Sequence, residues 1–282
     1  MISEEFDFEA PSALPDALAL LARHGADATL LSGGMSLMPM TTLGLVYPGL
    51  IISLNHIAEL DYVREDGAEL RIGALTRHAD VAANPLIREH APLLAEAAAM
   101  IGDVQVRNRG TIGGSIAHAD PAANYLPAAL ALGARLRLQS EAGERSVEAR
   151  DFFQGVMTTA IEANEMLTEI AIPKLAAGTG TSYQRLIRVE GNFAIVIAAA
   201  IVEPGRQAAR VALGNVAPGP VLVDVSAQVE GGLDDGALAA IGDAAFEAAD
   251  AAASDLASDA NYRRQMARVF ARRAVQSAAA AA

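Results

Sequence analysis

Two short glycine-rich segments are the parts of this sequence best suited to bind an anion. They are Leu31-Ser-Gly-Gly-Met-Ser-Leu37 and Arg109-Gly-Thr-Ile-Gly-Gly-Ser115. Glycine tolerates positive φ angles, so successive backbone N–H groups can point into one concavity and approach a phosphate closely. Four side chains add hydroxyl donors: Ser32, Ser36, Thr111 and Ser115. Together the two segments favour a pyrophosphate site that depends on backbone dipoles and hydroxyls.

A plainer interpretation stays open, because a Gly-Gly pair between a strand and a helix is often only a tight turn. The dinucleotide pattern G-x-G-x-x-G is absent, and so is the G-K-[ST] ending of a P-loop. The spacing alone therefore favours neither a Rossmann domain nor an NTPase.

Composition excludes several other kinds of chemistry. The chain has no cysteine, so it forms no disulfide, holds no iron–sulfur cluster and has no thiolate nucleophile. Its five histidines are scattered without metal-ligand spacing, and we expect no metal site. A net charge of −13 argues against nucleic acid as a partner. No apolar run is long enough to cross a bilayer, and with the acidic start this favours a cytoplasmic protein.

Alternating helices and strands are expected to position the two segments. A helical pattern from Leu14 to Leu21, with Gly25 as its C-cap, precedes a buried strand over 28–31. That strand leads directly into the first glycine segment. A second strand is expected over 50–54. Asp66-Gly67 is typical of a hairpin.

The middle of the chain predicts further elements around the second segment. Thr76 is a candidate cap for a short helix, and 87–101 is expected to form one helix that ends at Gly102. A helix over 121–132, a hairpin around Gly143 and a strand over 166–172 follow.

The pattern changes near residue 175. Three successive strands are expected over 182–189, 193–202 and 208–213, and two helices follow them over 235–254 and 261–277. The sequence therefore predicts an α+β protein with a small C-terminal domain that contains a three-stranded antiparallel sheet.

Several strings resemble the FAD-binding medium subunit of the xanthine dehydrogenase and aerobic carbon monoxide dehydrogenase family. The most specific is the string that contains the second segment, from Val106 to Pro121, and the first segment resembles the family's other glycine loop. Weaker matches occur over 165–173, 183–196 and in the last helix. The resemblance extends over nearly the whole chain, in the family's order.

The resemblance implies a two-lobed FAD-binding fold of the vanillyl-alcohol oxidase type. Residues 1–175 would form it, with lobes of about 1–57 and 58–175, and residues 178–282 would form the C-terminal α+β domain. The two segments would hold the FAD pyrophosphate, and Asp120 would bond the ribityl or ribose hydroxyls. The implied FAD-binding residues are Ser32, Gly33, Gly34, Met35, Ser36, Leu37, Thr111, Gly113, Gly114, Ser115, Asp120, Leu167, Arg185 and Phe193.

Three of these residues have alternative interpretations that the sequence leaves open. Asp120 is equally suited to cap the following helix. Phe193 would be an ordinary core residue if it began an apolar strand, and Arg185 would contact solvent if it did not neutralise the cofactor. Met35 departs from the family, which usually has a polar residue there.

The resemblance also implies a function. The chain would be an oxidoreductase subunit that passes electrons through FAD from a partner's [2Fe–2S] clusters to an external acceptor. Its partners would be a molybdenum-cofactor large subunit and a [2Fe–2S] small subunit, in a heterohexamer with two copies of each subunit. No residue of this chain is assigned a catalytic role. The alternatives are a self-sufficient FAD oxidase and a non-catalytic scaffold subunit with empty glycine turns.

Overall fold

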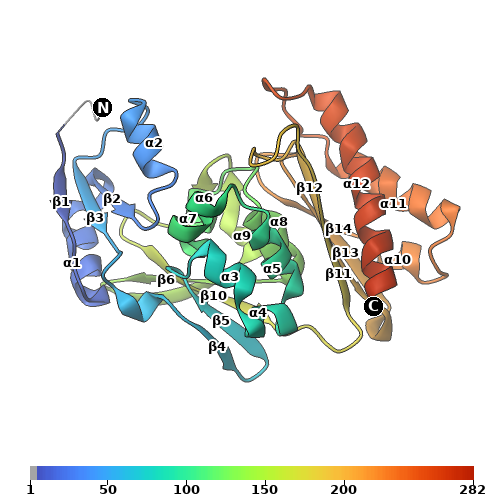
Figure 1. The fold of residues 1–282 in the computed structure, drawn as a ribbon, viewed down its shortest axis with the longest axis horizontal. Helices are drawn as coiled ribbons and strands as arrows, with labels where there is room; N and C mark the ends of the chain where they lie inside the picture. Colours follow the sequence, from blue (N-terminus) through green and yellow to red (C-terminus); the bar gives the residue numbers. More distant parts are fainter. Residues whose placement is uncertain (1–4) are drawn as a thin grey trace.

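The computed structural model describes residues 5–282, so the first four residues of the acidic start lie outside it. Three β-sheets follow one another along the chain and along the long axis of the molecule (Figure 1). The sheet nearest the N-terminus lies at one end, and the sheet covered by the last helices lies at the other. A further two-stranded ribbon, β8 (Phe153–Gly155) with β9 (Thr158–Thr159), lies in the middle region.

The N-terminal sheet is parallel, with strand order β1-β3-β2. It packs against α1, whose buried residues Ala17, Leu18 and Leu21 have helical spacing. Gly25 ends α1 with a φ of 51°, as its predicted role as a C-cap requires. The elements are β1 (Asp7–Glu9), α1 (Leu14–His24), β2 (Ala28–Leu31), α2 (Leu37–Thr42) and β3 (Leu50–Ser53).

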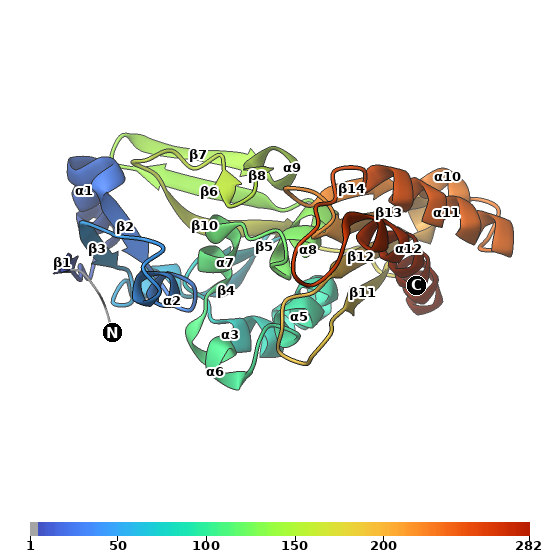
Figure 2. The same cartoon turned by 90° about the horizontal axis from the view of Figure 1, so that it is seen from above.

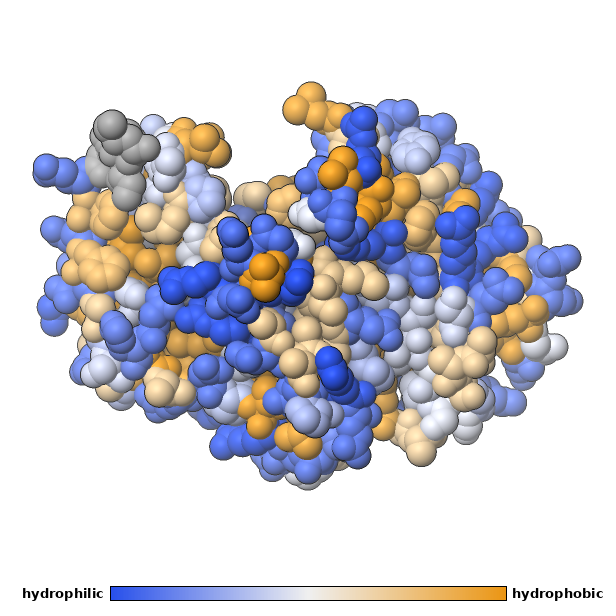
Figure 3. All heavy atoms as spheres, viewed as in Figure 1, coloured by the Kyte–Doolittle hydropathy of each residue, from blue (hydrophilic) through white to orange (hydrophobic). Residues whose placement is uncertain are grey.

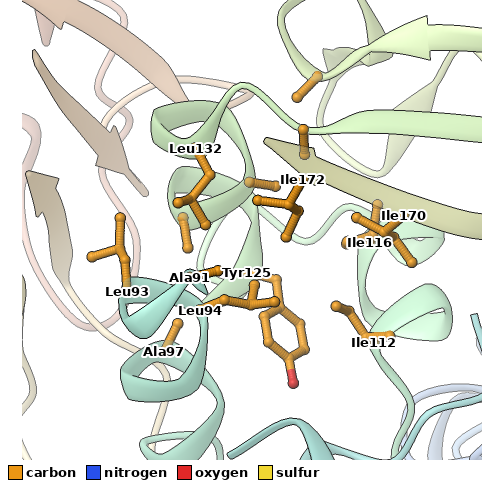
Figure 4. Packing of buried hydrophobic residues seen from close by; sticks show 14 of the residues in the cluster. Ala91, Leu93, Leu94, Ala97, Ile112, Ile116, Tyr125, Leu132, Ile170 and Ile172 are labelled. Atoms are coloured by element: carbon orange, nitrogen blue, oxygen red, sulfur yellow. The ribbon is translucent and has the colours of Figure 1, made fainter. Parts of the chain in front are cut away.

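The middle sheet is antiparallel, and its strands in spatial order are β4 (Val63–Asp66), β5 (Glu69–Gly73), β10 (Met166–Pro173), β6 (Arg135–Ser140) and β7 (Gly143–Glu148). On its central strand β10, Ile170 and Ile172 join the apolar core, whereas the intervening Glu169 is also buried and pairs with Arg71. Figure 2 shows helices on one side of this sheet. Figure 4 shows the core between them, where Tyr125 packs beside Leu94 and points its hydroxyl away from the aliphatic side chains.

Short helices fill the connections of this middle region. Its strands are β4 (Val63–Asp66), β5 (Glu69–Gly73), β6 (Arg135–Ser140), β7 (Gly143–Glu148), β8 (Phe153–Gly155), β9 (Thr158–Thr159) and β10 (Met166–Pro173). Its helices are α3 (His78–Ala83), α4 (Pro85–His90), α5 (Pro92–Ala99), α6 (Val104–Arg109), α7 (Ile112–His118), α8 (Tyr125–Leu132) and α9 (Ala149–Phe152).

The helix predicted over 87–101 is wrong in detail. Pro92 starts a new helix, α5, after Ala91 leaves the helical conformation, so two helices replace one. The suggested cap at Thr76 is also wrong. Its hydroxyl donates to the Tyr62 carbonyl oxygen, and Arg77 precedes α3 without a side-chain cap.

The C-terminal sheet has four strands, so the predicted three-stranded sheet is wrong. Its order is β11-β12-β13-β14, and every neighbouring pair is antiparallel. The fourth strand follows Pro218-Gly219-Pro220 and has only four residues, three of them at least partly exposed, so it lacks a long apolar pattern. The elements are β11 (Gly180–Leu186), β12 (Val196–Glu203), β13 (Ala208–Gly214), β14 (Val221–Asp224), α10 (Ser226–Val229), α11 (Asp235–Ala248) and α12 (Ala260–Ala281).

Helices α11 and α12 pack against this sheet through a second apolar core. Within it, Arg263 of α12 is buried and donates to the side chain of Asn215 at 3.0 Å. Asn215 in turn donates to the Ala194 carbonyl oxygen at 2.7 Å. Through these bonds α12 fixes the loop between β11 and β12.

Candidate functional site

The first glycine segment is the connection between β2 and α2. Gly34 has a φ of 75°, a conformation that favours glycine. Within the described chain, the backbone N–H groups of Gly33, Gly34, Met35 and Ser36 have no hydrogen-bond acceptor. Four successive donors are therefore left for a ligand, as an anion site requires.

The second glycine segment is the start of α7, and its donors are already used. Thr111 is the N-cap, and its Oγ1 accepts from Gly114 N at 3.1 Å. Ile112 N donates to the Thr76 carbonyl oxygen at 3.0 Å, Gly113 N to that of Ala74 at 2.9 Å, and Ser115 N to that of Thr111 at 3.1 Å. This segment can offer hydroxyl groups to a ligand, whereas its backbone N–H groups at 112–115 already donate to acceptors within the protein.

The two segments lie against each other although almost 80 residues separate them. Thr111 Oγ1 donates to Ser32 Oγ at 3.1 Å. A Cβ on Gly114 would lie 2.5 Å from Ser32 Oγ, and a Cβ on Gly33 would lie 2.6 Å from Gly110 Cα. The sequence predicted that these glycines are needed for positive φ angles. That holds for Gly34 alone, because Gly33, Gly113 and Gly114 have other φ values and are needed for close packing.

A cavity of about 720 Å³ opens at this crossing. Figure 3 shows the surface hollowed between the N-terminal region and the C-terminal region. All of the predicted site residues line it, from three separate parts of the chain: Ser32, Gly33, Gly34, Met35, Ser36, Leu37, Thr111, Gly113, Gly114, Ser115, Asp120, Leu167, Arg185 and Phe193.

Asp120 and Leu167 lie in the middle region of the cavity wall. Asp120 Oδ1 accepts from Ala122 N at 2.8 Å, which makes a local turn. Helix α8 starts later, after Asn124, so the helix-cap alternative for Asp120 is wrong. Leu167 is buried on β10, where the register with β6 shifts between Leu167 and Glu169. Such a bulge re-aims side chains, here beside the cavity.

Arg185 and Phe193 come from the C-terminal domain and form the opposite wall. The Arg185 guanidinium donates to the Met100 carbonyl oxygen and, at 3.0 Å, to Glu190. Its side chain is only 10% exposed, so the solvent-facing alternative is wrong. Phe193 is 68% exposed and precedes β12, so it is no core residue. Its ring stands at the cavity rim.

Two titratable groups in the wall have shifted pKa values. A hydrogen bond from Arg145 lowers the pKa of Glu165 and keeps this carboxylate ionised and paired. Burial lowers the pKa of His78 to about 4, so the imidazole is neutral near pH 7. The Glu165 carboxylate is therefore paired with Arg145 where it lines the cavity.

Sequence reasoning missed part of the cavity wall. Met100, Ile101 and Gly102 line it after the end of α5, and His78 lines it from the start of α3. The only signal for the first group was Gly102, which was interpreted as a helix end and has a φ of 46°. A single histidine in an apolar pattern carries no signal of its own.

Two other kinds of site are missing from the described residues. Within residues 5–282 no cluster of three or more histidine, aspartate or glutamate side chains is arranged to hold a metal ion. No described helix combines the length and the apolar character that a membrane span requires.

Comparison with known families divides the chain at the same place as its sheets. Residues 4–175 match the family described as the FAD binding domain in molybdopterin dehydrogenase. Residues 181–278 match the CO dehydrogenase flavoprotein C-terminal domain.

Known proteins match over most or all of the chain. The carbon monoxide dehydrogenase medium chain of Hydrogenophaga pseudoflava is 39% identical, with 99% of this chain and 98% of that protein covered. The caffeine dehydrogenase subunit beta of a Pseudomonas species is 34% identical over 77% of this chain and 75% of its own.

Solved structures share the fold. A carbon monoxide dehydrogenase from Hydrogenophaga pseudoflava superimposes with a TM-score of 0.94 at 40% identity, covering 99% of both chains. Quinoline 2-oxidoreductase from Pseudomonas putida 86 superimposes with a TM-score of 0.90 at 31% identity, again over 99% of both chains. The chain therefore belongs to the family of FAD-binding medium subunits of molybdopterin dehydrogenases, a family of oxidoreductases.

Proposed function

We propose that this chain is the FAD-carrying electron-transfer subunit of a molybdenum hydroxylase or dehydrogenase complex. The observation that carries the proposal is the crossing of the two glycine segments over one cavity. There Ser32 and Thr111 are hydrogen-bonded, and four successive N–H groups are free.

The donor set fits a pyrophosphate. The N–H groups of 33–36 supply fixed dipoles, and Ser32, Ser36 and Ser115 line the same cavity with hydroxyl donors. This suits a chain with a net charge of −13, because backbone dipoles attract phosphate without adding lysine or arginine. We assign the phosphate contacts mainly to the first segment, since the N–H groups of 112–115 already have acceptors.

The remaining site residues suit the other parts of FAD. The Asp120 carboxylate has acceptor capacity beyond its bond to Ala122 N and would accept from ribityl or ribose hydroxyls. Leu167 would pack on a ring face, and the exposed Phe193 ring would cover the isoalloxazine. Arg185, held by Met100 and Glu190, would present its guanidinium group in the nearby wall.

When bound, FAD supplies one- and two-electron transfer, and the protein holds and tunes it. A chain without cysteine needs its iron–sulfur clusters in another subunit. We therefore propose a [2Fe–2S] partner and a molybdenum-cofactor partner, in a heterohexamer with two copies of each subunit. We also propose that the two N-terminal sheets are lobes of the vanillyl-alcohol oxidase type, and that residues 178–282 fold as a separate domain. The cytoplasmic location stays a prediction.

The visible spectrum of the purified full-length chain tests the cofactor assignment. We expect released FAD, identified by chromatography after denaturation, or uptake of added FAD by a colourless preparation. A chain that carries no flavin and binds none would overturn the proposal and favour the scaffold alternative.

Anaerobic reduction tests the electron path. In the assembled complex, substrate should reduce the flavin, whereas the isolated, flavin-loaded chain should stay oxidised with the same substrate. Turnover of substrate by the isolated chain would instead support the self-sufficient oxidase.

A further inference from the structure

His78 is the one buried histidine that lines the cavity without a role in the proposed site. It begins α3, is 5% exposed, and its backbone N–H donates to the Gly110 carbonyl oxygen at 3.0 Å. A Cβ on Gly110 would lie 2.7 Å from His78 Cδ2 and closer still to Nε2. The imidazole edge therefore lies against Gly110, which also contacts Gly33 where the two glycine segments cross.

Tyr125 fixes the tautomer of this imidazole. Its hydroxyl lies 3.1 Å from His78 Nδ1, which is its only hydrogen-bond partner within residues 5–282. A completely buried hydroxyl needs an acceptor for its hydrogen atom. Burial raises the pKa of Tyr125 and lowers that of His78, so both groups are neutral near pH 7. Tyr125 thus donates to Nδ1, and the single ring proton of His78 lies on Nε2.

Nε2–H is then a donor without a protein acceptor. Within the described chain His78 has no side-chain hydrogen bond other than the one to Tyr125, and its ring lines the cavity. Nε2 is not one of the fully buried unpaired side-chain atoms of the described residues, so it keeps accessible surface, and His78 lines the cavity, where a ligand or water can accept from it. The ring lies beside Gly110 at the crossing of the glycine segments, where the proposed site places the phosphates.

We propose that His78 Nε2–H donates a hydrogen bond to the ADP half of the bound FAD, and that Tyr125 holds the imidazole in the donating tautomer. The inference rests on the proposed function, because it needs FAD in this cavity. It adds a ligand-binding residue that the two glycine segments do not include.

Binding of FAD and of ADP to full-length variants tests the contact. In His78→Asn the amide oxygen can replace Nδ1 as acceptor for Tyr125, but no donor reaches the Nε2 position. In His78→Gln the longer amide can place a donor there. We expect His78→Asn to weaken FAD and ADP about tenfold, the effect of one hydrogen bond, and His78→Gln to stay within about threefold of the wild type.

Nitrogen NMR of ¹⁵N-labelled histidine gives a readout that is independent of affinity. We expect His78 to be protonated on Nε2 in the free chain, and its Nε2–H to become protected from exchange when ADP binds. In Tyr125→Phe the tautomer should become mixed.

The outcomes separate the two proposals. A wild-type chain that binds FAD and ADP, with His78→Asn equally tight, would overturn this inference and assign the donor to water. Protonation on Nδ1 would overturn it as well. A wild-type chain that binds neither nucleotide would overturn the proposed function together with the inference.

Discussion

Replacing Gly33 by alanine tests whether the crossing of the glycine segments makes the site. The new Cβ would lie 2.6 Å from Gly110 Cα and 2.9 Å from the Arg109 carbonyl carbon, and both are backbone atoms. Carbon atoms in contact are ordinarily about 3.5–4.0 Å apart, so the two segments must separate by roughly 1 Å. Overpacking of this kind costs about 1–3 kcal/mol of stability.

The larger effect is expected on FAD affinity. If the first glycine segment shifts by about 1 Å, about two of its four free N–H groups move out of hydrogen-bonding range of a phosphate. A hydrogen bond to a charged group contributes about 1.5–3 kcal/mol, so the loss is about 3–6 kcal/mol, or about 10²- to 10⁴-fold in Kd. Fluorescence titration with FAD measures this loss, and thermal melting of the same samples measures stability.

Two other glycines provide a control and an intermediate case. A Cβ on Gly205 would meet nothing within 4 Å, and its φ is not positive, so Gly205→Ala should change neither quantity. Gly34 has positive φ but only flexible side chains nearby, at 3.3 Å, so Gly34→Ala should add about 1–2 kcal/mol of backbone strain. The loss of FAD affinity in Gly34→Ala should lie between that in Gly33→Ala and that in Gly205→Ala. Wild-type FAD affinity in Gly33→Ala would refute the reasoning.

Three further predictions concern single side chains. Asp120→Asn keeps the acceptor for Ala122 N but not the charge, and should weaken FAD about tenfold in titrations without changing the melting temperature. A loss confined to Asp120→Ala would assign the carboxylate to the turn alone. His78 should make the protein less stable at low pH, because its folded pKa is about 4 against an ordinary value of 6.5. The unfolded chain binds the proton first, so the contribution is intact above about pH 6.5 and is lost, by up to about 3 kcal/mol, as the pH falls through 4. Urea unfolding should show a shallower decline for His78→Gln, and parallel curves would contradict the assignment. Arg263→Gln removes donors to Asn215 and the ion pair with Asp255, and should cost roughly 1.5–3 kcal/mol in urea unfolding. It should also increase protease cleavage in the loop between β11 and β12, and an unchanged cleavage rate would separate that loop from α12.

Local sequence patterns were enough to place most strands and both glycine segments. The run 28–31 and the glycines after it predicted a strand followed by a loop. This prediction needs only neighbouring residues, because a short apolar run favours a strand and a Gly-Gly pair favours a turn. The packing of the segments was not predictable in this way. Gly33 contacts Gly110 only because two separate sheets bring them together, and no local pattern reports a contact over that separation.

The features that the sequence did not predict have similar physical causes. Strand β14 is short and half exposed, so its strand character depends on pairing with β13 rather than on its own residues. The donor role inferred for His78 depends on Tyr125, which is 47 residues away. For Phe193 the apolar run did predict a strand, but the strand starts three residues later and leaves the ring exposed at the cavity rim.

The central position of β10 has a consequence for how the chain folds. β10 lies between β5 and β6, yet it follows both in the sequence, so two hairpins are complete before the strand that joins them exists. During synthesis each hairpin exposes an unpaired edge until residues 166–173 emerge, and such edges promote association with other chains. Closure of the sheet then requires a contact across about 100 residues, which is slow. The C-terminal sheet, by contrast, pairs each strand with its neighbour in sequence and can form quickly. Chains truncated before β10 should therefore aggregate, whereas chains that contain it should proceed to a closed sheet.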